Sequence, residues 1–319
     1  MRHFRLSAFA ALAFAVVVAC GSSSGSGGSS SGTSGSSGAL PGEDGAGADG
    51  GPVVGPDGEV LDSPAPPPPP VYVKSTRETT TFGGQTRLYN LSVPVDYDAS
   101  KVYPLVLSFH GSPGTADLML TYDPFDGASK KEAIIAYPNA LGSDWDLGTA
   151  TAQNPDMGFT KALVDELAAK WSIDKNRVYG VGWSGGGFFV NQLACRMGGL
   201  MRAMAVHAGG APYDEVNPGA PRYPNNFLKC TAAVPIATIV FHGQLDNTVP
   251  YAGGEFDATY WAYVSGCSDS TSPTTPAPCQ RHDNCPAATP VTFCGLPNSG
   301  HGVSTDGFAT SWAFFKALP

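Results

Sequence analysis

Ser184 stands in a run of residues whose order can create a nucleophile. The run is Gly182-Trp183-Ser184-Gly185-Gly186, and it joins an apolar, strand-like segment, 177–182, to a helical one, 188–195. On so tight a strand-to-helix turn, only small residues fit beside the serine, and its Oγ is raised above the sheet. A phosphate-binding turn would need Gly-Lys-Ser/Thr, and 177–196 contains no lysine. We therefore predict that Ser184 is a nucleophile.

A serine nucleophile needs a histidine base, and a carboxylate must orient that histidine. After a turn of this kind, the acid follows the serine in the chain and the histidine comes last. His301 lies just beyond the last strand-like segment, 291–294, and we predict that it is the base. His207 and His242 end apolar segments, where we expect structural imidazoles bonded to backbone, and His282 lies in a cysteine-rich insertion.

Asp246 is the predicted acid. It follows the apolar segment 236–241 and so is expected at the same edge of the sheet as Ser184. The alternatives Asp257, Asp269 and Asp283 fall in a predicted helix or in the cysteine-rich insertion, where capping or turn roles suit them better.

Ester or amide hydrolysis also needs N–H groups that face the developing oxyanion. One usually comes from the residue after the nucleophile and one from the loop after an earlier strand. We predict the backbone N–H groups of Gly185 and Ser112, the latter in the loop that begins His110-Gly111.

The elements that must hold these residues alternate along the chain. A helix is predicted near 155–171, where Phe159, Leu163, Leu167 and Trp171 recur every four residues after the possible cap Asn154. Such alternation favours an α/β fold with a mostly parallel central sheet and helices on both faces. With the turn at Ser184, it predicts an α/β-hydrolase fold, with a small disulfide-stapled insertion before His301. Strands are predicted at 88–93, 105–109, 133–137, 177–182, 203–207, 236–241 and 291–294.

Several of these segments carry a family resemblance that extends from about residue 83 to the C-terminus. They are Arg87-Leu-Tyr-Asn-Leu-Ser-Val-Pro94, Pro104-Leu-Val-Leu-Ser-Phe-His-Gly111, Asp174-Lys-Asn-Arg-Val-Tyr179, the turn at Ser184, and His242-Gly-Gln-Leu-Asp-Asn-Thr-Val-Pro-Tyr251. Together they resemble the polyhydroxybutyrate depolymerase and feruloyl/acetylxylan esterase family. The resemblance implies a triad of Ser184, Asp246 and His301, with Ser112 and Gly185 in the oxyanion hole.

The sequence departs from that family at two positions. Members often have asparagine where this chain has Gly185, and a His-Thr-Trp-Pro run where it has His301-Gly-Val-Ser304. The second change removes an aromatic side chain beside the base, so the resemblance predicts the reaction more firmly than the substrate.

The N-terminal segment has the features of an export signal. Residues 1–19 combine Arg2 and Arg5 with an uncharged apolar run, as in a signal peptide, and the following Cys20 makes the segment resemble a bacterial lipobox. We predict cleavage before Cys20, a lipid on that cysteine, a disordered Gly/Ser- and Pro-rich linker over 20–70, and a hydrolase domain over 71–319. The apolar run is too short to be a membrane-spanning helix.

Six further cysteines remain, an even number that in an exported protein predicts three disulfides rather than a zinc site. Fifteen pairings are possible. We predict Cys195 with Cys230, and two nested bridges that close one compact insertion, Cys267 with Cys294 and Cys279 with Cys285.

Charge argues against a nucleic-acid partner. Without the two arginines of the signal, 16 basic residues face 27 acidic ones, a net charge of −11. We predict a serine esterase outside the cytoplasm that needs no cofactor or metal. Its expected partners are the anchoring membrane and an ester substrate, either feruloyl or acetyl groups on plant polysaccharide or a polyhydroxybutyrate-type polyester. A serine peptidase and a non-catalytic surface lipoprotein are the other interpretations.

Overall fold

The computed structural model describes residues 72–122, 124–210, 212, 221–230 and 232–319. The predicted signal peptide, Cys20 and the linker lie outside these residues. In the part of the chain that is described, no helix has the length and apolar character needed to cross a membrane.

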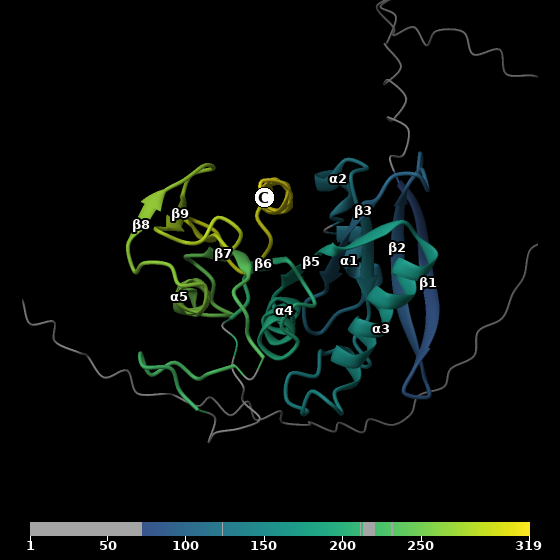
Figure 1. Cartoon of the computed structure of the whole chain (residues 1–319), viewed down its shortest axis with the longest axis horizontal. Helices are drawn as coiled ribbons and strands as arrows, with labels where there is room; N and C mark the ends of the chain where they lie inside the picture. The colour runs from purple at the N-terminus through teal and green to yellow at the C-terminus, as the bar shows by residue number, and fades with distance from the viewer. Residues whose placement is uncertain (1–71, 123, 211, 213–220, 231) are drawn as a thin grey trace, which may run out of the picture. The chain divides into compact units, whose positions relative to one another are not determined.

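A ten-stranded mixed sheet organises the described residues, in the order β1-β2-β4-β3-β5-β6-β7-β10-β9-β8 (Figure 1). The six central strands, from β4 to β10, run parallel, whereas β2 and β1 at one edge and β9 and β8 at the other pair antiparallel. In chain order the strands are β1 (Tyr72–Phe82), β2 (Gln85–Pro94), β3 (Tyr103–Phe109), β4 (Ile134–Pro138), β5 (Ile173–Trp183), β6 (Ala203–His207), β7 (Ala237–Gly243), β8 (Thr271–Pro273), β9 (Cys279–His282) and β10 (Val291–Leu296).

Helices cover both faces of this sheet. In Figure 1, α3, α4 and α5 lie on one side, and α2 and the C-terminal helix α6 lie on the other. Each side has its own cluster of buried apolar residues, and α1 contributes to the cluster on the α6 side. The helices are α1 (Ala116–Tyr122), α2 (Asp126–Ser129), α3 (Pro155–Lys170), α4 (Gly185–Arg196), α5 (Tyr251–Val264) and α6 (Gly307–Lys316).

The α/β class predicted from the sequence is confirmed, as are the seven predicted strands. The central strands β3, β4, β6 and β7 are buried along their whole length, which is why they read as continuous apolar runs. Helix α3 begins as expected, because the Asn154 side chain accepts hydrogen bonds from the N–H groups of Asp156 and Met157. The pattern does not predict β1, a threonine-rich edge strand whose pairing with β2 shifts register between Ser75 and Glu78.

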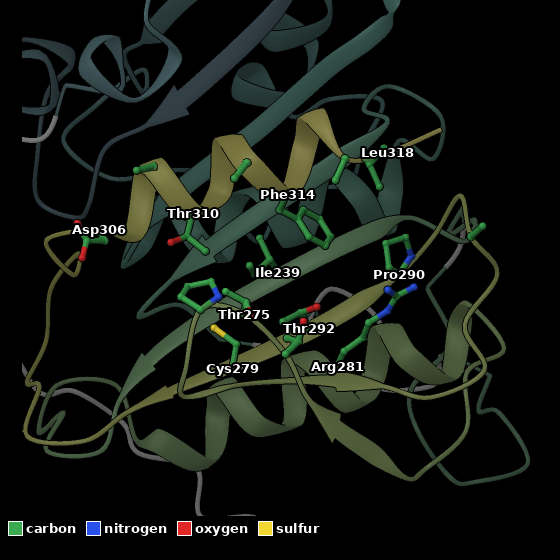
Figure 2. A pocket seen from close by; sticks show the side chains of 16 residues that line it. Ile239, Thr275, Cys279, Arg281, Pro290, Thr292, Asp306, Thr310, Phe314 and Leu318 are labelled. Carbon is green, nitrogen blue, oxygen red and sulfur yellow. The ribbon is translucent and has the colours of Figure 1, made fainter.

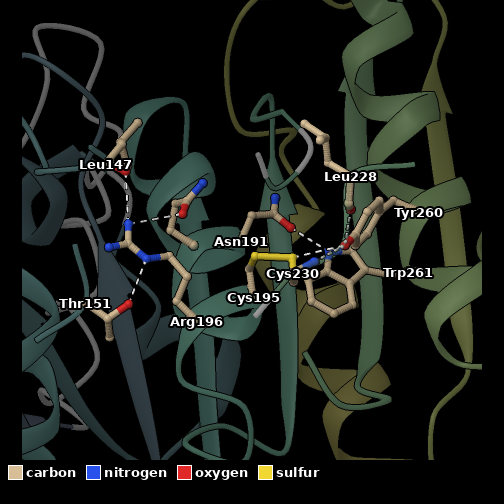
Figure 3. The surroundings of a disulfide bond; sticks show 10 residues. Leu147, Thr151, Asn191, Cys195, Arg196, Leu228, Cys230, Tyr260 and Trp261 are labelled. Atoms are coloured by element: carbon tan, nitrogen blue, oxygen red, sulfur yellow. Dashed lines mark hydrogen bonds between the residues drawn. A yellow bond between two sulfur atoms is a disulfide. The ribbon is translucent and has the colours of Figure 1, made fainter. Parts of the chain in front are cut away.

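One predicted disulfide is confirmed. Cys195, in α4, is bonded to Cys230. Figure 3 shows that Tyr260, from α5, lies beside this bridge. Its hydroxyl donates to the carbonyl of Leu228 at 3.0 Å and accepts from the N–H of Cys230 at 3.2 Å. The bridge and this tyrosine together attach the segment around Cys230 to two helices.

The two nested bridges predicted for the insertion are wrong. The structure joins Cys267 to Cys285 and Cys279 to Cys294, so the bridges cross in sequence. Strand register is the reason: Cys279 on β9 stands directly opposite Cys294 on β10 in the antiparallel pair. Residues opposite each other in such a pair have close Cβ atoms, which suits a disulfide.

His207 is fully buried at the end of β6, which fits the predicted structural role, but the predicted bond from its ring to the backbone is wrong, because the ring contacts a side-chain hydroxyl instead. Its ring stacks on Phe241 with centroids 4.5 Å apart, and its Nε2 lies 3.2 Å from the hydroxyl of Ser311. Its Nδ1 has no hydrogen-bond partner among the described residues. Burial lowers the pKa of His207 to about 3, because nothing nearby compensates a charged ring.

His207 should therefore make the folded protein acid-sensitive. The unfolded chain binds a proton at this side chain near pH 6.5 and the folded chain does not, so stability is lost as pH falls below that value. We expect His207→Phe, which keeps an aromatic ring on Phe241, to lessen this loss by about 1.4 kcal/mol per pH unit between about pH 6 and pH 4. Urea unfolding at a series of pH values measures the difference, and parallel curves for the two proteins would contradict it.

Candidate active site

Ser184 occupies the junction of β5 and α4 in an unusual backbone conformation. Its φ and ψ are 52° and −119°, outside the regions that residues with a side chain normally adopt. Two positions of the turn must be glycine, because neighbouring backbone atoms leave no room for a side chain. A Cβ on Gly182 would lie 2.2 Å from the carbonyl oxygen of Gly186, and one on Gly186 would lie 2.2 Å from that of Phe109. The turn can therefore fold back on itself at Gly182 and lie against the end of β3 at Gly186 only because both positions lack side chains.

The side chains of Ser184, His301 and Asp246 form one hydrogen-bonded chain. His301 Nε2 lies 2.9 Å from Ser184 Oγ, and His301 Nδ1 lies 2.8 Å from Asp246 Oδ2. The carboxylate can only accept, so the Nδ1 proton points to Asp246 and Nε2 accepts from the serine hydroxyl. The three predicted residues thus come together, with Ser184 after β5, Asp246 after β7 and His301 after β10. These strands are parallel, so their carboxyl ends lie at one edge of the sheet.

Asp246 sits in a pocket of hydrogen-bond donors. Its side chain is fully buried, and its Oδ1 accepts from the N–H groups of Thr248 at 2.8 Å and Val249 at 2.9 Å. Burial by itself raises the pKa of Asp246, but the hydrogen bonds from His301, Val249 and Thr248 outweigh it and lower the pKa below its usual value. The carboxylate therefore stays ionised beside His301.

Two loops meet to place His301. The N–H of Leu245 donates to the carbonyl of Ser299 at 2.9 Å. A Cβ on Gly243 would lie 2.3 Å from the same carbonyl oxygen, so the loop that carries Asp246 packs directly on the loop that carries His301. The His301 side chain is 17% exposed, and the ring of Trp183 lies 5.6 Å away between centroids. The packing of the two loops therefore holds His301 in place, while part of its imidazole remains accessible to solvent.

The two residues predicted to supply the oxyanion donors lie side by side. A Cβ on Gly185 would lie 3.0 Å from the backbone nitrogen of Ser112 and 2.2 Å from its Oγ. The loop that carries Ser112 is braced by His110, whose Nδ1 donates to the carbonyl of Gly111 and whose Nε2 accepts from the N–H of Ala140. His110 thus has a structural role in this loop.

The other candidate residues lie apart from this chain of hydrogen bonds, with one exception. Asp257 is buried in α5, where its Oδ2 accepts from Asn191, and burial raises its pKa well above the usual value. His282 and Asp283 lie in the insertion, where the former contacts the carbonyl of Ser268 and the latter accepts from Ser272. The exception is His242, which contacts both the backbone and Asp246. Its residue type and position alone do not reveal the second contact.

An open hollow lies beside His301. It has a volume of about 340 Å³ and is lined by His301 and neighbours in the segments 299–305 and at Leu296. A larger groove of about 570 Å³ lies between α6 and the β8–β9 hairpin (Figure 2). Ile239 and Thr292 form part of its floor, and Ser184 and Asp246 are not among the described residues that line it. In the described part of the chain, no group of three or more His, Cys, Asp and Glu residues could hold a metal ion.

A mostly parallel sheet with serine, aspartate and histidine meeting at its carboxyl edge defines the chain as an α/β-hydrolase. Among solved structures, it is similar to the acetyl xylan esterase from Aspergillus awamori, with a TM-score of 0.58 and 17% identity over 73% of this chain and 94% of that one. No family model matches.

Curated relatives make the relationship more specific. The chain is 26% identical over 244 residues to feruloyl esterase B of Piromyces equi, covering 70% of this chain but only 44% of that protein. It is 27% identical over 247 residues to the probable feruloyl esterase C of Aspergillus niger, covering 72% of this chain and 84% of that one. The chain is therefore an α/β-hydrolase that is distantly similar to feruloyl esterases.

Proposed function

We propose that this protein is a carboxylic ester hydrolase that works through an acyl-enzyme on Ser184. The observation that carries the proposal is the hydrogen-bonded chain from Asp246 through His301 to the serine hydroxyl. Ser184 Oγ attacks the ester carbonyl carbon while His301 Nε2 takes its proton. The tetrahedral intermediate then collapses, and the leaving alcohol takes that proton. Water attacks the acyl-enzyme in the same way, releasing the acid and restoring Ser184.

Asp246 and two backbone N–H groups have supporting roles in this mechanism. The Asp246 carboxylate stabilises the imidazolium that forms at His301 and keeps its Nδ1 proton in place. The N–H groups of Gly185 and Ser112 donate to the oxyanion. Their role is supported by the contact between Gly185 and the Ser112 backbone. Preorganised donors of this kind typically contribute about 3–4 kcal/mol to transition-state stabilisation.

Feruloyl or acetyl esters on plant polysaccharide are the proposed substrates. The relatives named feruloyl esterases, at 26% and 27% identity, support the feruloyl group, and the structural likeness adds no substrate information beyond the fold. The open hollow beside His301 leaves room for an ester that remains attached to a polymer. A polyhydroxybutyrate-type polyester is the second candidate, because an open site of this kind also suits a chain end.

Ser184→Ala should abolish ester hydrolysis, with kcat lower by about 10⁶-fold, because it removes the hydroxyl that His301 contacts and that would carry the acyl group. A fluorescent fluorophosphonate should label the wild-type protein and leave Ser184→Ala unlabelled. Ser100→Ala, in an exposed turn, is the matched control and should label normally. If folded wild-type protein resists labelling, or Ser184→Ala keeps its esterase activity, the mechanism is wrong.

The two substrate classes can be separated with intact wild-type protein. We expect release of ferulate from methyl ferulate and from feruloylated arabinoxylan, measured by chromatography, and no clearing of polyhydroxybutyrate films. Acetylated xylan and an amide analogue of methyl ferulate complete the panel. Film hydrolysis without ferulate release would reverse the ranking of the substrates, and cleavage of the amide would favour a peptidase.

We further propose that the protein acts outside the cytoplasm and is held to a membrane through a lipid on Cys20. Three disulfides among the described residues support an oxidising compartment. The lipid rests on the sequence alone, since Cys20 follows a signal-like segment. The 20–70 segment would then separate the enzyme from the surface and allow it to reach a polymer.

Cys20→Ser tests the anchor. In a bacterial host, we expect the wild-type protein to incorporate radioactive palmitate and to fractionate with membranes, because acyl chains contribute about 0.8 kcal/mol per buried methylene. Cys20→Ser should lose both properties and keep its specific activity. Equal membrane association of the two proteins, without label in either, would rule out the lipid.

A further inference from the structure

His242 is a second imidazole in contact with the acid of the site. It lies on β7, one residue before its end, and its side chain is fully buried. Its Nε2 lies 3.2 Å from Asp246 Oδ2 and 2.9 Å from the carbonyl oxygen of Val249. Both of these groups are acceptors, so the ring must carry its proton on Nε2 and share it between them. Asp246 Oδ2 therefore faces two imidazoles, those of His301 and His242.

His242 contacts two residues of the turn that follows β7, Asp246 and Val249. Asp246 and Val249 are already joined, because Asp246 Oδ1 accepts from the N–H of Val249. The imidazole closes a second connection between them, from the carboxylate to the Val249 carbonyl. Without this donor, two backbone N–H groups would still hold Oδ1, but Oδ2 would be held only by His301, the residue that it has to orient. Because the χ2 torsion of aspartate has only broad preferences of its own, Oδ2 would then be less firmly fixed.

Helix α5 holds the ring of His242 in place. A Cβ on Gly254 would lie 2.4 Å from Nδ1 and 2.7 Å from Cγ of His242, so this glycine packs directly on the imidazole. Nδ1 is buried and has no hydrogen-bond partner among the described residues. No acceptor there competes for the ring's proton, which leaves it on Nε2. Packing, rather than a polar contact on the far side, orients the ring toward Asp246.

We propose that His242 is a positioning residue for catalysis: it donates from Nε2 to Asp246 and Val249, and so fixes the carboxylate that orients His301. This inference rests on the proposed function, because it assigns a role within the same triad. It gives the close packing of Gly254 on the imidazole a catalytic consequence, since any shift of the ring moves the donor away from Oδ2. It also separates the imidazole of His242 from that of His207, which is equally buried but contacts the hydroxyl of Ser311; His207 meets the triad only through its backbone carbonyl, which accepts from the N–H of Ser184.

Two neighbouring glycines of α5 allow a matched test. Gly254→Ala should push the imidazole away from Asp246, whereas Gly253→Ala meets only Val249 Cγ1 at 3.8 Å. The same helix receives the same methyl group in both variants. We expect Gly254→Ala to lower kcat by about 10- to 100-fold, as a displacement of about 1 Å can, with KM within about two-fold of wild type. Gly253→Ala should keep the wild-type kcat.

The rate of fluorophosphonate labelling should fall by the same factor in Gly254→Ala, because it reports activation of Ser184 by His301 without product release. Equal labelling rates in the two glycine variants would overturn the role of His242. A wild-type protein that does not label at all would instead overturn the proposed function, so the two failures are distinguishable.

Replacing the imidazole itself provides a second test, which still applies if Gly254→Ala does not fold. A glutamine amide at position 242 can donate to Asp246, whereas leucine fills similar space without a donor. We expect folded His242→Gln to stay within about five-fold of the wild-type kcat, and folded His242→Leu to fall by about 10- to 100-fold. Equal losses in both variants would reduce His242 to a packing residue and overturn the proposal.

Discussion

The hydrogen bond between His301 and Asp246 joins residues 55 positions apart, and the organisation of the site depends on it. It can form because β7 and β10 are parallel neighbours, paired from Val291 with Thr238 to Leu296 with Gly243. Parallel strands end at the same edge, so the loops that follow them meet there. Ser184 reaches that edge from β5, with β6 lying between β5 and β7. The sheet thus brings together three short loops that lie far apart in the sequence.

Close backbone packing gives these loops their precision. The turn at Ser184 is so tight that Gly182 admits no side chain, and it lies so near to β3 that Gly186 admits none either. The serine itself has a positive φ of 52°, a conformation that costs about 1–3 kcal/mol for a residue with a Cβ. The packing around the turn, which joins the buried end of β5 to α4, must supply that free energy. The same kind of packing recurs where Gly243 lies against Ser299 and where Gly254 lies against His242.

The cysteine-rich insertion shows how tertiary pairing overrides a plausible pattern in sequence. Nested bridges would have closed two concentric loops between Cys267 and Cys294. Instead, β9 folds back on β10 and places Cys279 opposite Cys294, which leaves Cys267, just after α5, to join Cys285. The hairpin thereby becomes part of the main sheet. It also forms one wall of the groove beside α6 in Figure 2.

Much of the architecture and of the candidate site was accessible from the sequence, because both depend on local order. Buried parallel strands appear as apolar runs, Asn154 stands before its helix, and the order of Ser184, Asp246 and His301 follows the order of the strands. Only the tertiary structure decided the strand register that pairs the cysteines and the contact of His242 with Asp246. Those features depend on which atoms face each other across elements. A distance of 3.2 Å between two buried side chains has no counterpart in residue type or spacing.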